Sequence, residues 1–344
     1  MSSSSQPLVS VLTPVYNDAE YLSECIESVL AQTYTNWEYT IVDNCSKDES
    51  CAIAQKYAAK DARIRVVTNS DFLRIIQNHN RTIQHLSPLS KYCKFVFADD
   101  WLYPACLEEM VRHAEQNPSA GLVSSYTMDG RAVLWEGPKY SGRAFSGREV
   151  CREKLLGGPY VFGTMTTMLV RSDLIRKRPK FFNEENLHAD NEACFDVLQE
   201  SDFGFVHQIL SYSRPRPQSN HSLAQENDSI ELGEYVIFLK YGPVFLNPAE
   251  YERRKAYMCR WYHRVLATNV LRLRPQAFWQ YHERTLAAFN TRIDRGLLSR
   301  MVVTELASRL SHPLHALRML WQWWSRALLR LVSANRAVRR EPAR

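Results

Sequence analysis

Leu8-Val-Ser-Val-Leu-Thr-Pro-Val-Tyr-Asn17, near the start of the chain, decides the fold class. The run Leu8–Leu12 is apolar and stops at a Thr-Pro pair, which predicts a buried strand followed by a loop. Apolar residues then recur at helical spacing over residues 22–30, with Asn17-Asp18 placed to cap that helix. A second strand pattern follows at residues 37–42. A strand, a helix and a strand in this order predict a β-α-β unit.

The same alternation continues along the chain. Further strand patterns lie at residues 63–67, 94–98 and 121–124, and helix patterns lie around residues 53–58, 74–86 and 107–114. We therefore expect an α/β fold in which a parallel sheet carries helices on both faces. In such sheets, ligands bind outside the carboxyl ends of the strands. The loops at these ends are all polar, and they are Thr13–Asn17, Asp43–Asp48 and Asp99–Pro104.

The composition of the 344 residues excludes several classes of protein. With 45% hydrophobic and 23% charged residues, 12 Gly and 15 Pro, the chain is neither disordered nor fibrous. No run of about 18 apolar residues predicts a transmembrane helix, and residues 1–6 do not resemble a signal peptide. The eight cysteines form no Cys-x-x-Cys pair, which argues against a zinc ribbon and favours reduced thiols in a cytosolic protein.

The net charge of +6 is the sum of two unlike parts. Residues 251–344 hold 19 Lys or Arg and 5 Asp or Glu, whereas residues 1–250 hold 24 and 32. Residues 314–332 place Trp and Leu on one helical arc, with Arg mostly opposite. Such a helix suits an anionic membrane surface, and the alternative is a terminal helix packed on the body. No nucleic-acid-binding motif accompanies the charge, so we expect no nucleic-acid partner.

Two adjacent carboxylates, Asp99 and Asp100, follow the strand pattern at residues 94–98. Adjacent carboxylates repel each other, and a bound cation offsets that repulsion. Mg²⁺ is typically held by one or two carboxylates together with substrate phosphates. The alternative is that the pair caps the helix that follows.

Two further strand-end loops carry polar and aromatic side chains. Asp43 and Asn44 follow a strand, and they either contact a base or ribose or form an Asx-turn. The segment Pro14-Val-Tyr16-Asn17 offers an aromatic ring that can stack on a base and an amide that can cap the next helix. Its alternative is a plain loop leading into that helix.

Taken together, these segments resemble the family 2 glycosyltransferases, a large inverting group with the GT-A fold. The resemblance runs in order through residues 9–17, 21–22, 28–34, 41–48, 75–81 and 97–104, and it covers about residues 8–215. It implies a Rossmann-like nucleotide-diphospho-sugar transferase fold with a helical C-terminal extension. We accordingly expect a catalytic domain at 1–227, a helical extension at 228–310, and a basic amphipathic helix and tail at 311–344.

The resemblance also implies roles for individual residues. Those expected to bind the donor are Pro14, Tyr16, Asn17, Asp43, Asn44, Asp99 and Arg214. Asp99 matches the last Asp of the family's Asp-x-Asp signature, which holds Mg²⁺ or Mn²⁺ on the donor diphosphate, while Phe97 replaces the first Asp. Asp99 and Asp100 are therefore the expected metal ligands. Asp190 matches the family's catalytic base, whereas Glu192 lies about 200° further around the helix and is expected to be solvated.

The sequence thus predicts a metal-dependent inverting glycosyltransferase that uses a nucleotide-sugar donor. The expected acceptor is a hydroxyl of a glycan or lipid-linked molecule in cell-surface polysaccharide biosynthesis. We expect the protein in the cytoplasm, with a peripheral contact to the inner face of the membrane through residues 311–344. Two alternatives remain open: a catalytically degenerate scaffold that binds a nucleotide or glycan, supported by Phe97, and a membrane-surface adaptor.

Overall fold

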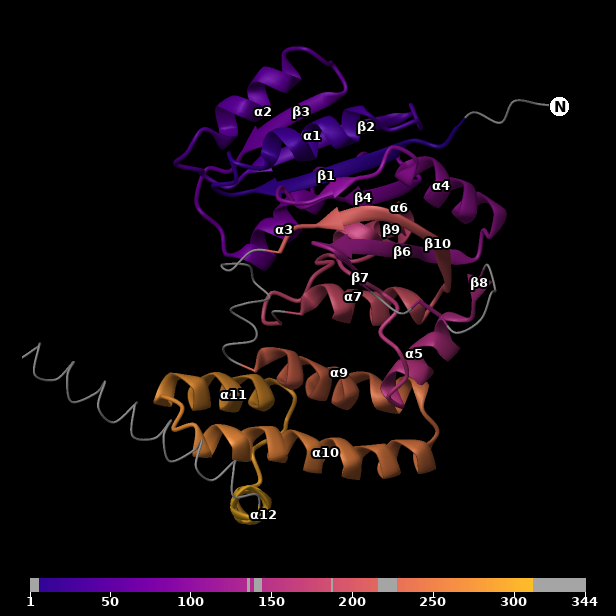
Figure 1. Cartoon of the computed structure of the whole chain (residues 1–344). Helices are drawn as coiled ribbons and strands as arrows, with labels where there is room; N and C mark the ends of the chain where they lie inside the picture. Colours follow the sequence, from indigo (N-terminus) through magenta and orange to yellow (C-terminus); the bar gives the residue numbers. More distant parts are fainter. Residues whose placement is uncertain (1–5, 135–136, 139–143, 187, 216–227, 312–344) are drawn as a thin grey trace, which may run out of the picture. The chain divides into compact units, whose positions relative to one another are not determined.

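The computed structural model describes residues 6–134, 137–138, 144–186, 188–215 and 228–311 (Figure 1). The chain divides into two compact units, residues 1–254 and 255–344. The domain boundaries expected after residues 227 and 310 stay predictions. Except for Ser311, the basic helix and tail expected at 311–344 lie outside the described residues. Among the helices of the described part, none combines the length and the apolar character needed to cross a membrane.

The first unit is built on one sheet with helices on both of its faces (Figure 1). The strands are β1 (Val9–Val15), β2 (Trp37–Asp43), β3 (Ile64–Thr68), β4 (Tyr92–Phe95), β5 (Trp101–Leu102), β6 (Ala120–Asp129), β7 (Ala132–Leu134), β8 (Ala144–Phe145), β9 (Leu169–Arg171) and β10 (Asp202–Ser213). Within the described residues the strand order is β3-β2-β1-β4-β9-β6-β10-β5, with β7 beside β6 and β8 beside β10.

Up to β6, and apart from the two-residue strand β5, the helices of the described residues alternate with the strands as the sequence predicts. They are α1 (Leu22–Leu30), α2 (Ser50–Ala58), α3 (Ile75–Ile83), α4 (Cys106–Gln116), α5 (Gly147–Leu155), the 3-10 turn η1 (Met165–Thr167), α6 (Ser172–Arg176), α7 (Ala189–Leu198), α9 (Ser229–Phe245), α10 (Pro248–Leu271), α11 (Gln276–Ala288) and α12 (Arg295–Leu310). The apolar positions that predict α1 are the buried ones, namely Leu22, Cys25, Ile26 and Val29.

The sheet is mixed, which corrects the expectation of a parallel sheet. Strands β3, β2, β1 and β4 are parallel, and β6 pairs in parallel with β10. Strand β9, however, runs antiparallel to both β4 and β6, and the short strands β5, β7 and β8 also pair antiparallel. Strands of two or three residues are too short to show a hydrophobic period, so the sequence pattern does not predict them.

The main hydrophobic core lies between the sheet and the helices α1, α2 and α4. Side chains of β1 and β2 alternate, so that Val9, Val11, Tyr39 and Ile41 belong to this core. Each fully buried aliphatic side chain contributes about 1.5–3 kcal/mol to folding. The opposite face of the sheet is covered in part by α3 and α7 (Figure 1).

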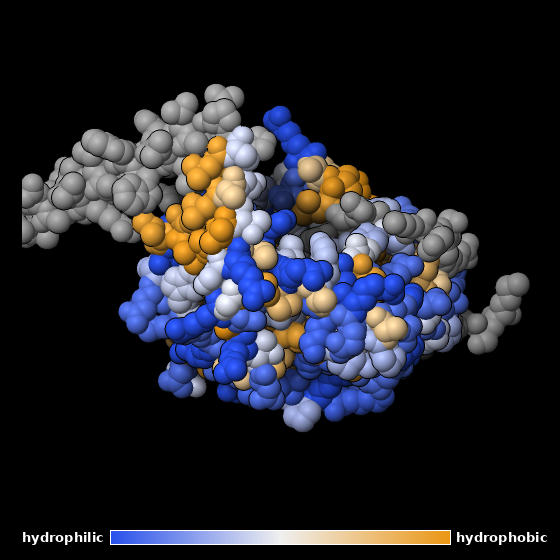
Figure 2. All heavy atoms as spheres, turned by 90° about the horizontal axis from the view of Figure 1, so that it is seen from below, coloured by the Kyte–Doolittle hydropathy of each residue, from blue (hydrophilic) through white to orange (hydrophobic). Residues whose placement is uncertain are grey.

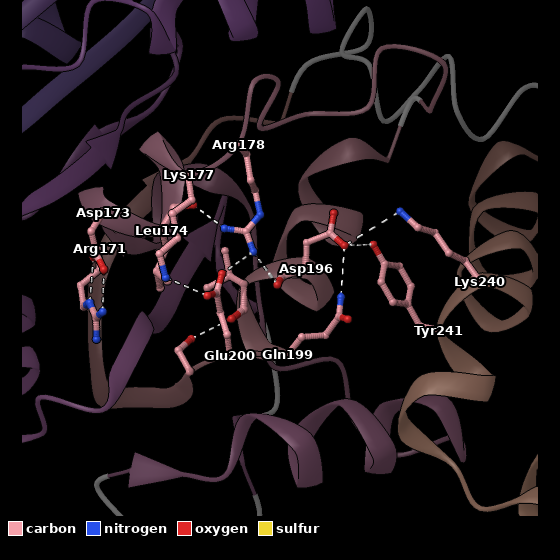
Figure 3. Close-up of polar contacts among 12 residues, drawn as sticks. Arg171, Asp173, Leu174, Lys177, Arg178, Asp196, Gln199, Glu200, Lys240 and Tyr241 are labelled. Atoms are coloured by element: carbon pink, nitrogen blue, oxygen red, sulfur yellow. Dashed lines mark hydrogen bonds and ion pairs between the residues drawn. The ribbon is translucent and has the colours of Figure 1, made fainter.

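Helix α7 is tied to the segments on either side of it (Figure 3). On α9, the Tyr241 hydroxyl donates to Asp196 Oδ1 at 2.6 Å, and Lys240 Nζ lies 3.9 Å from the same oxygen. On the other side, Arg178 donates to the Asp196 carbonyl at 2.7 Å and pairs with Glu200 at 3.0 Å. Helix α7 is therefore fixed on the first unit by polar contacts as well as by packing.

The second unit contains most of α10 together with α11 and α12. Its buried polar contacts join these helices: Tyr262 hydrogen-bonds to His282 Nδ1 at 2.6 Å, and the backbone N–H of Asp294 donates to His263 Nε2 at 3.0 Å. Helix α12 buries none of its residues, and Val303 and Leu310 are 66% and 70% exposed. The face drawn in Figure 2 is mostly hydrophilic and carries separate hydrophobic patches.

Candidate active site

The loops after β1 and β2 are joined to each other through Asn17. Its backbone N–H donates to Ser46 Oγ at 3.0 Å, and its Oδ1 accepts from the backbone N–H of Lys47 at 2.8 Å. Asn17 has a φ of 54°, a conformation that Asn tolerates better than most residues. The predicted cap is therefore wrong: α1 begins after Tyr21 without a side-chain cap, because Asn17 binds the second loop instead.

Asp43 and Asn44 lie buried where β2 ends, 2% exposed each. The Asp43 carboxylate accepts from the backbone N–H of Ser46, three residues on, at 3.4 and 3.3 Å. It closes the turn after β2, although the bond is one residue longer than that of an Asx-turn. Asn44 donates to the Leu73 carbonyl at 2.8 Å and accepts from Leu73 N–H at 3.0 Å and Asn69 Nδ2 at 2.9 Å. Asn44 thus fixes the β3–α3 loop to the end of β2, and its contact with a donor base stays a prediction.

An exposed pair of aromatic rings stands beside these loops. Tyr16 and Phe72 are 40% and 58% exposed, and their ring centroids lie 4.8 Å apart. Large exposed apolar rings next to polar groups are typical of a surface that receives a ligand. Pro14 pairs with Val42 in the β1–β2 register, and it lies two residues before Tyr16 in the sequence. The predicted nucleotide-binding loops after β1 and β2 therefore do come together.

Asp100 is buried beyond the end of β4, whereas the adjacent Asp99 is half-buried. Asp100 Oδ2 accepts from Thr166 Oγ1 at 2.6 Å and from Ser213 Oγ at 3.5 Å. Its Oδ1 accepts from the backbone N–H of Arg214 at 3.2 Å. Asp100 is therefore an anchor that fastens this turn to η1 and to the end of β10. The expected strand at 94–98 ends at Phe95 because Phe97 N–H donates to Thr166 Oγ1 at 3.2 Å rather than to a strand.

The electrostatics of this pair favour a cation. Burial, together with the charge of Asp99, raises the pKa of Asp100 to about 7. Among the described residues, no three His, Cys, Asp or Glu side chains are grouped so as to hold a metal ion by themselves. Mg²⁺ and Mn²⁺ in phosphate-transfer sites take one or two carboxylates and complete their ligand shell with phosphate and water. The residues present fit such an ion, with Asp99 as the more exposed carboxylate.

Arg214 stands next to Asp99. Its Nε donates to the Asp99 carbonyl at 3.3 Å, its guanidinium pairs with Glu24, and it lies over the ring of Tyr21 at 4.6 Å from the centroid. The ring of Trp101 stacks on Tyr212 at 5.1 Å, which helps to hold the end of β10 against the 99–102 segment. The structure thus brings the guanidinium of Arg214 to the backbone carbonyl of Asp99, 115 positions away in the sequence.

The start of α7 carries Asp190, half-buried, and Glu192, which is only 2% exposed. The expectation of a solvated Glu192 is wrong. Its carboxylate accepts from Asn186 Nδ2 at 2.7 Å and from Asn183 Nδ2 at 3.2 and 3.1 Å, and it pairs with Lys240 Nζ at 2.6 Å. Glu192 therefore ties the segment before α7 and helix α9 to the helix that carries Asp190.

The surroundings of Asp190 suit a proton acceptor. Burial raises the pKa of Asp190, and the nearby His188 opposes that rise. Its Oδ1 accepts from the backbone N–H of Asn191 at 2.8 Å. A carboxylate whose pKa is raised binds a proton more readily than an exposed one, which is what general-base catalysis requires.

Comparison with known proteins shows the family. The family model described as Glycosyl transferase family 2 matches residues 10–177. EpsE of Bacillus subtilis (strain 168), named as a glycosyltransferase, is 35% identical over 224 residues, which cover 61% of this chain and 79% of EpsE. The chain belongs to glycosyl transferase family 2. It spans 14%, 62% and 31% of the length of three other curated relatives that it matches.

Solved structures show the fold that this family 2 chain adopts. TarS of S. aureus, in complex with UDP-GlcNAc, superimposes with a TM-score of 0.60 at 18% identity over 82% of this chain and 80% of that one. The mannosyltransferase PcManGT of Pyrobaculum calidifontis, in complex with GDP-Man and Mn²⁺, gives a TM-score of 0.54 at 14% identity over 93% and 85%. The predicted GT-A fold with C-terminal helices is confirmed.

The predicted site residues fall into three groups in this fold. The first is the β1–β2 loop group, Pro14, Tyr16, Asn17, Asp43 and Asn44, and the second is Asp99, Asp100 and Arg214. Asp190, the third, is the second residue of α7. Helix α7 begins near the edge of the sheet at which β1 and β4 end (Figure 1). A link between α3 and the approach to α7 is made by Asn80, which donates to the Phe182 carbonyl at 2.8 Å and accepts from its N–H at 2.9 Å.

The sequence did not indicate the residues that hold these groups in place. Thr166 and Ser213 bind Asp100 from 66 and 113 positions away, and Phe72 supports Tyr16. Only Lys94 left a visible sign, since it is a charged residue inside an apolar strand pattern. The roles of all predicted site residues in binding and catalysis stay predictions.

Proposed function

We propose that the chain transfers a sugar from a nucleotide-diphosphate-sugar donor to a hydroxyl of a glycan or lipid-linked acceptor. The observation that carries this proposal is the meeting of Asp99 and Arg214 beyond the end of β4, where Arg214 Nε lies 3.3 Å from the Asp99 carbonyl. A carboxylate for a divalent cation and a guanidinium for phosphate oxygens are the two groups that a diphosphate needs. Membership of glycosyl transferase family 2 supports the same reaction class.

Recognition of the donor is assigned to the β1 and β2 loops. The exposed rings of Tyr16 and Phe72 offer a stacking surface for a base, and Asp43 lies buried beside them with its carboxylate facing Ser46 N–H. TarS and PcManGT, which share the fold, are solved with UDP-GlcNAc and with GDP-Man. These neighbours support a nucleoside diphosphate sugar as the class of donor, and the base and the sugar follow from the experiment below.

The mechanism follows from where charge develops. When a hydroxyl attacks the anomeric carbon and the nucleoside diphosphate leaves, negative charge grows on the bridging phosphate oxygen. Mg²⁺ or Mn²⁺ held by Asp99, beside the anchor Asp100, would neutralise part of that charge. Arg214 donates to phosphate oxygens, and Asp190 accepts the proton of the attacking hydroxyl. A single displacement of this kind inverts the anomeric configuration.

We place this transfer in cell-surface polysaccharide biosynthesis, on the cytoplasmic side of the membrane. The predicted contact of residues 311–344 with anionic lipid is a separate part of the proposal. Co-sedimentation of the full chain with vesicles that contain phosphatidylglycerol, against vesicles of phosphatidylcholine alone, tests it. Equal sedimentation with both kinds of vesicle would contradict an electrostatic membrane contact.

The test of the function begins with thermal unfolding in the presence of UDP or GDP, each with and without Mn²⁺. A ligand that binds only the folded state raises the unfolding temperature, so we expect one nucleotide to do so, and more strongly with Mn²⁺. Turnover of UDP-GlcNAc or GDP-Man, followed as release of nucleoside diphosphate, then separates an enzyme from a degenerate scaffold. Metal-dependent binding without turnover of any donor or acceptor tried would favour the scaffold.

A further inference from the structure

Lys94 is a charged residue in the middle of the sheet. It lies on β4, is 0% exposed, and its Nζ donates to the Thr166 carbonyl at 2.6 Å and lies 3.4 Å from Met110 Sδ. Moving an ammonium group out of water costs several kcal/mol, which a single neutral carbonyl does not fully repay. Packing alone therefore gives no reason for a lysine at this position, and its hydrogen-bond partner indicates what it does.

That partner, Thr166, is also fully buried and makes two further contacts through its side chain. Its hydroxyl donates to Asp100 Oδ2 at 2.6 Å and accepts from the backbone N–H of Phe97 at 3.2 Å. One residue thus holds both ends of the turn 97–100, which contains Asp99. The turn η1, in which Thr166 lies, is in turn fixed to β4 by Lys94.

We propose that Lys94 and Thr166 are positioning residues of the donor site, which set the orientation of Asp99 through a buried chain of hydrogen bonds from Lys94 through Thr166 to Asp100. The proposal rests on the proposed function, because Asp99 is the carboxylate that faces a metal-bound diphosphate. Neither residue touches the donor, so both act through the turn 97–100. Their contribution is to binding of the metal-bound diphosphate rather than to recognition of the base.

The charges around Lys94 agree with this role. Burial lowers the pKa of Lys94, and the thiols of Cys106 and Cys93 and the carboxylate of Asp100 oppose that effect. Lys94 forms no ion pair with an Asp or Glu of the described residues, so it acts on the Asp99–Asp100 pair through Thr166. Replacing a buried charge by an apolar side chain of similar volume is often neutral or stabilising. A loss of binding in such a variant therefore separates positioning from stability.

The experiment measures binding of UDP and of GDP by calorimetry, with and without Mn²⁺, to wild type, Thr166→Val and Thr166→Ser. Thr166→Val keeps the shape but removes the closest of the three donors to Asp100, and Ser213 and Arg214 N–H remain. We therefore expect Mn²⁺-dependent binding to weaken about tenfold, on the scale of one lost hydrogen bond. Thr166→Ser restores the hydroxyl and should bind like wild type. Thr82→Val, at another buried threonine whose hydroxyl bonds a backbone carbonyl, is the matched control and should change nothing.

A second variant, Lys94→Met, removes the charge and keeps the volume. We expect it to unfold at or above the wild-type temperature and yet to lose Mn²⁺-dependent binding to a similar degree. Thr166→Val or a folded Lys94→Met that binds the metal-bound nucleotide like wild type would overturn the proposal. If Lys94→Met does not fold, the comparison of Thr166→Val with Thr166→Ser still decides it.

If wild type binds neither nucleotide with Mn²⁺, the proposed function is overturned. Amide hydrogen exchange then decides whether Thr166 positions the turn 97–100. Thr166→Val should then raise exchange at Phe97 and Asp100, whose N–H groups are held in this turn, and leave Ser46 in the β2 loop unchanged. Unchanged exchange at Phe97 would show that Thr166 does not hold the turn.

Discussion

Two acidic pairs, Asp99 with Asp100 and Asp190 with Glu192, are built in the same way. In each pair one carboxylate is almost fully buried and accepts hydrogen bonds from the protein, while the other is half-buried. The pairs differ in their donors. Asp100 accepts from two hydroxyls and a backbone N–H, all neutral, whereas Glu192 has the Lys240 ammonium at 2.6 Å.

The difference lies in the charge of the donors that the buried carboxylate of each pair accepts from. Glu192 has its positive partner within the fold, so the start of α7 is set without a ligand. Asp100, in contrast, accepts from two hydroxyls and a backbone N–H, and burial with the charge of Asp99 raises its pKa to about 7. A bound cation would offset the repulsion between the two adjacent carboxylates. We therefore expect the Asp99 side to depend on metal and the Asp190 side not to.

The largest effect is expected from Asp190→Asn. Because the amide cannot accept a proton, turnover should fall by roughly 10³-fold, within the usual range for loss of a general base. Nucleotide binding with Mn²⁺ should remain as in wild type, since Asp190 does not touch the donor diphosphate in the proposed mechanism. Initial rates of nucleoside diphosphate release and calorimetry measure the two quantities. Glu185→Gln, at an exposed carboxylate just before α7, is the matched control. Wild-type turnover in Asp190→Asn would remove it from the mechanism.

The next effect is expected from Asp99→Asn on the metal-dependent side. Loss of the carboxylate should remove most of the Mn²⁺-dependent part of nucleotide binding, a weakening on the order of 10²-fold for a charged metal ligand. Calorimetry of UDP or GDP across a Mn²⁺ titration gives this quantity. Asp61→Asn, at a carboxylate that pairs with Arg63 at the start of β3, should leave it unchanged. An Asp99→Asn variant with full Mn²⁺ dependence would break the contrast between the two pairs.

Glu192→Gln should produce a smaller, mixed effect. The amide keeps the shape but gives up the ion pair with Lys240, so the free energy of unfolding should fall by about 1–3 kcal/mol. Turnover should fall about tenfold as Asp190 loses its fixed orientation, with Mn²⁺-dependent binding intact. Urea unfolding, rates and calorimetry separate these effects. If binding falls instead of turnover, the two pairs do not act on separate steps.

The smallest effect is expected from His188→Gln on the pH dependence of turnover. Protonated His188 lowers the pKa of Asp190 against the rise that burial causes. Without that charge the pKa of Asp190 rises, so Asp190 stays protonated to a higher pH and the acid limb of the rate profile moves upward. The shift should be less than about one pH unit. A rate profile that moves to lower pH, or does not move, would mean that Asp190 does not set the acid limb.

Apart from the two-residue strand β5, the sequence predicted the architecture up to β6 because each element there is long enough to show its hydrophobic period. It also placed Asp43 and Asp99 at strand ends, since the ends of neighbouring parallel strands share one edge of the sheet. It failed on Glu192 for a physical reason. Glu192 lies about 200° around the helix from Asp190, and a residue there is solvated only if that face of the helix is exposed. Helix α7, however, buries eight of its ten residues.

The partners of the buried carboxylates were out of reach for another reason. Thr166 and Ser213 lie 66 and 113 positions from Asp100, and nothing in a single sequence connects them. The antiparallel strand β9, which follows η1 and brings Thr166 near β4, has three residues and no readable pattern. A local sequence pattern therefore does not predict hydrogen bonds between site residues that are far apart in the chain.

Two buried cysteines, one on α1 and one on α7, allow local opening of the structure around each helix to be measured as a rate. Cys25 on α1 and Cys194 on α7 are 0% and 1% exposed, and burial raises the pKa of the Cys25 thiol to about 12 and that of Cys194 well above its usual range. Such thiols are alkylated only when the surrounding structure opens. The labelling rates of these two cysteines therefore report how often the structure around α1 and around α7 opens. Saturating nucleotide should slow labelling at Cys25 more than at Cys194.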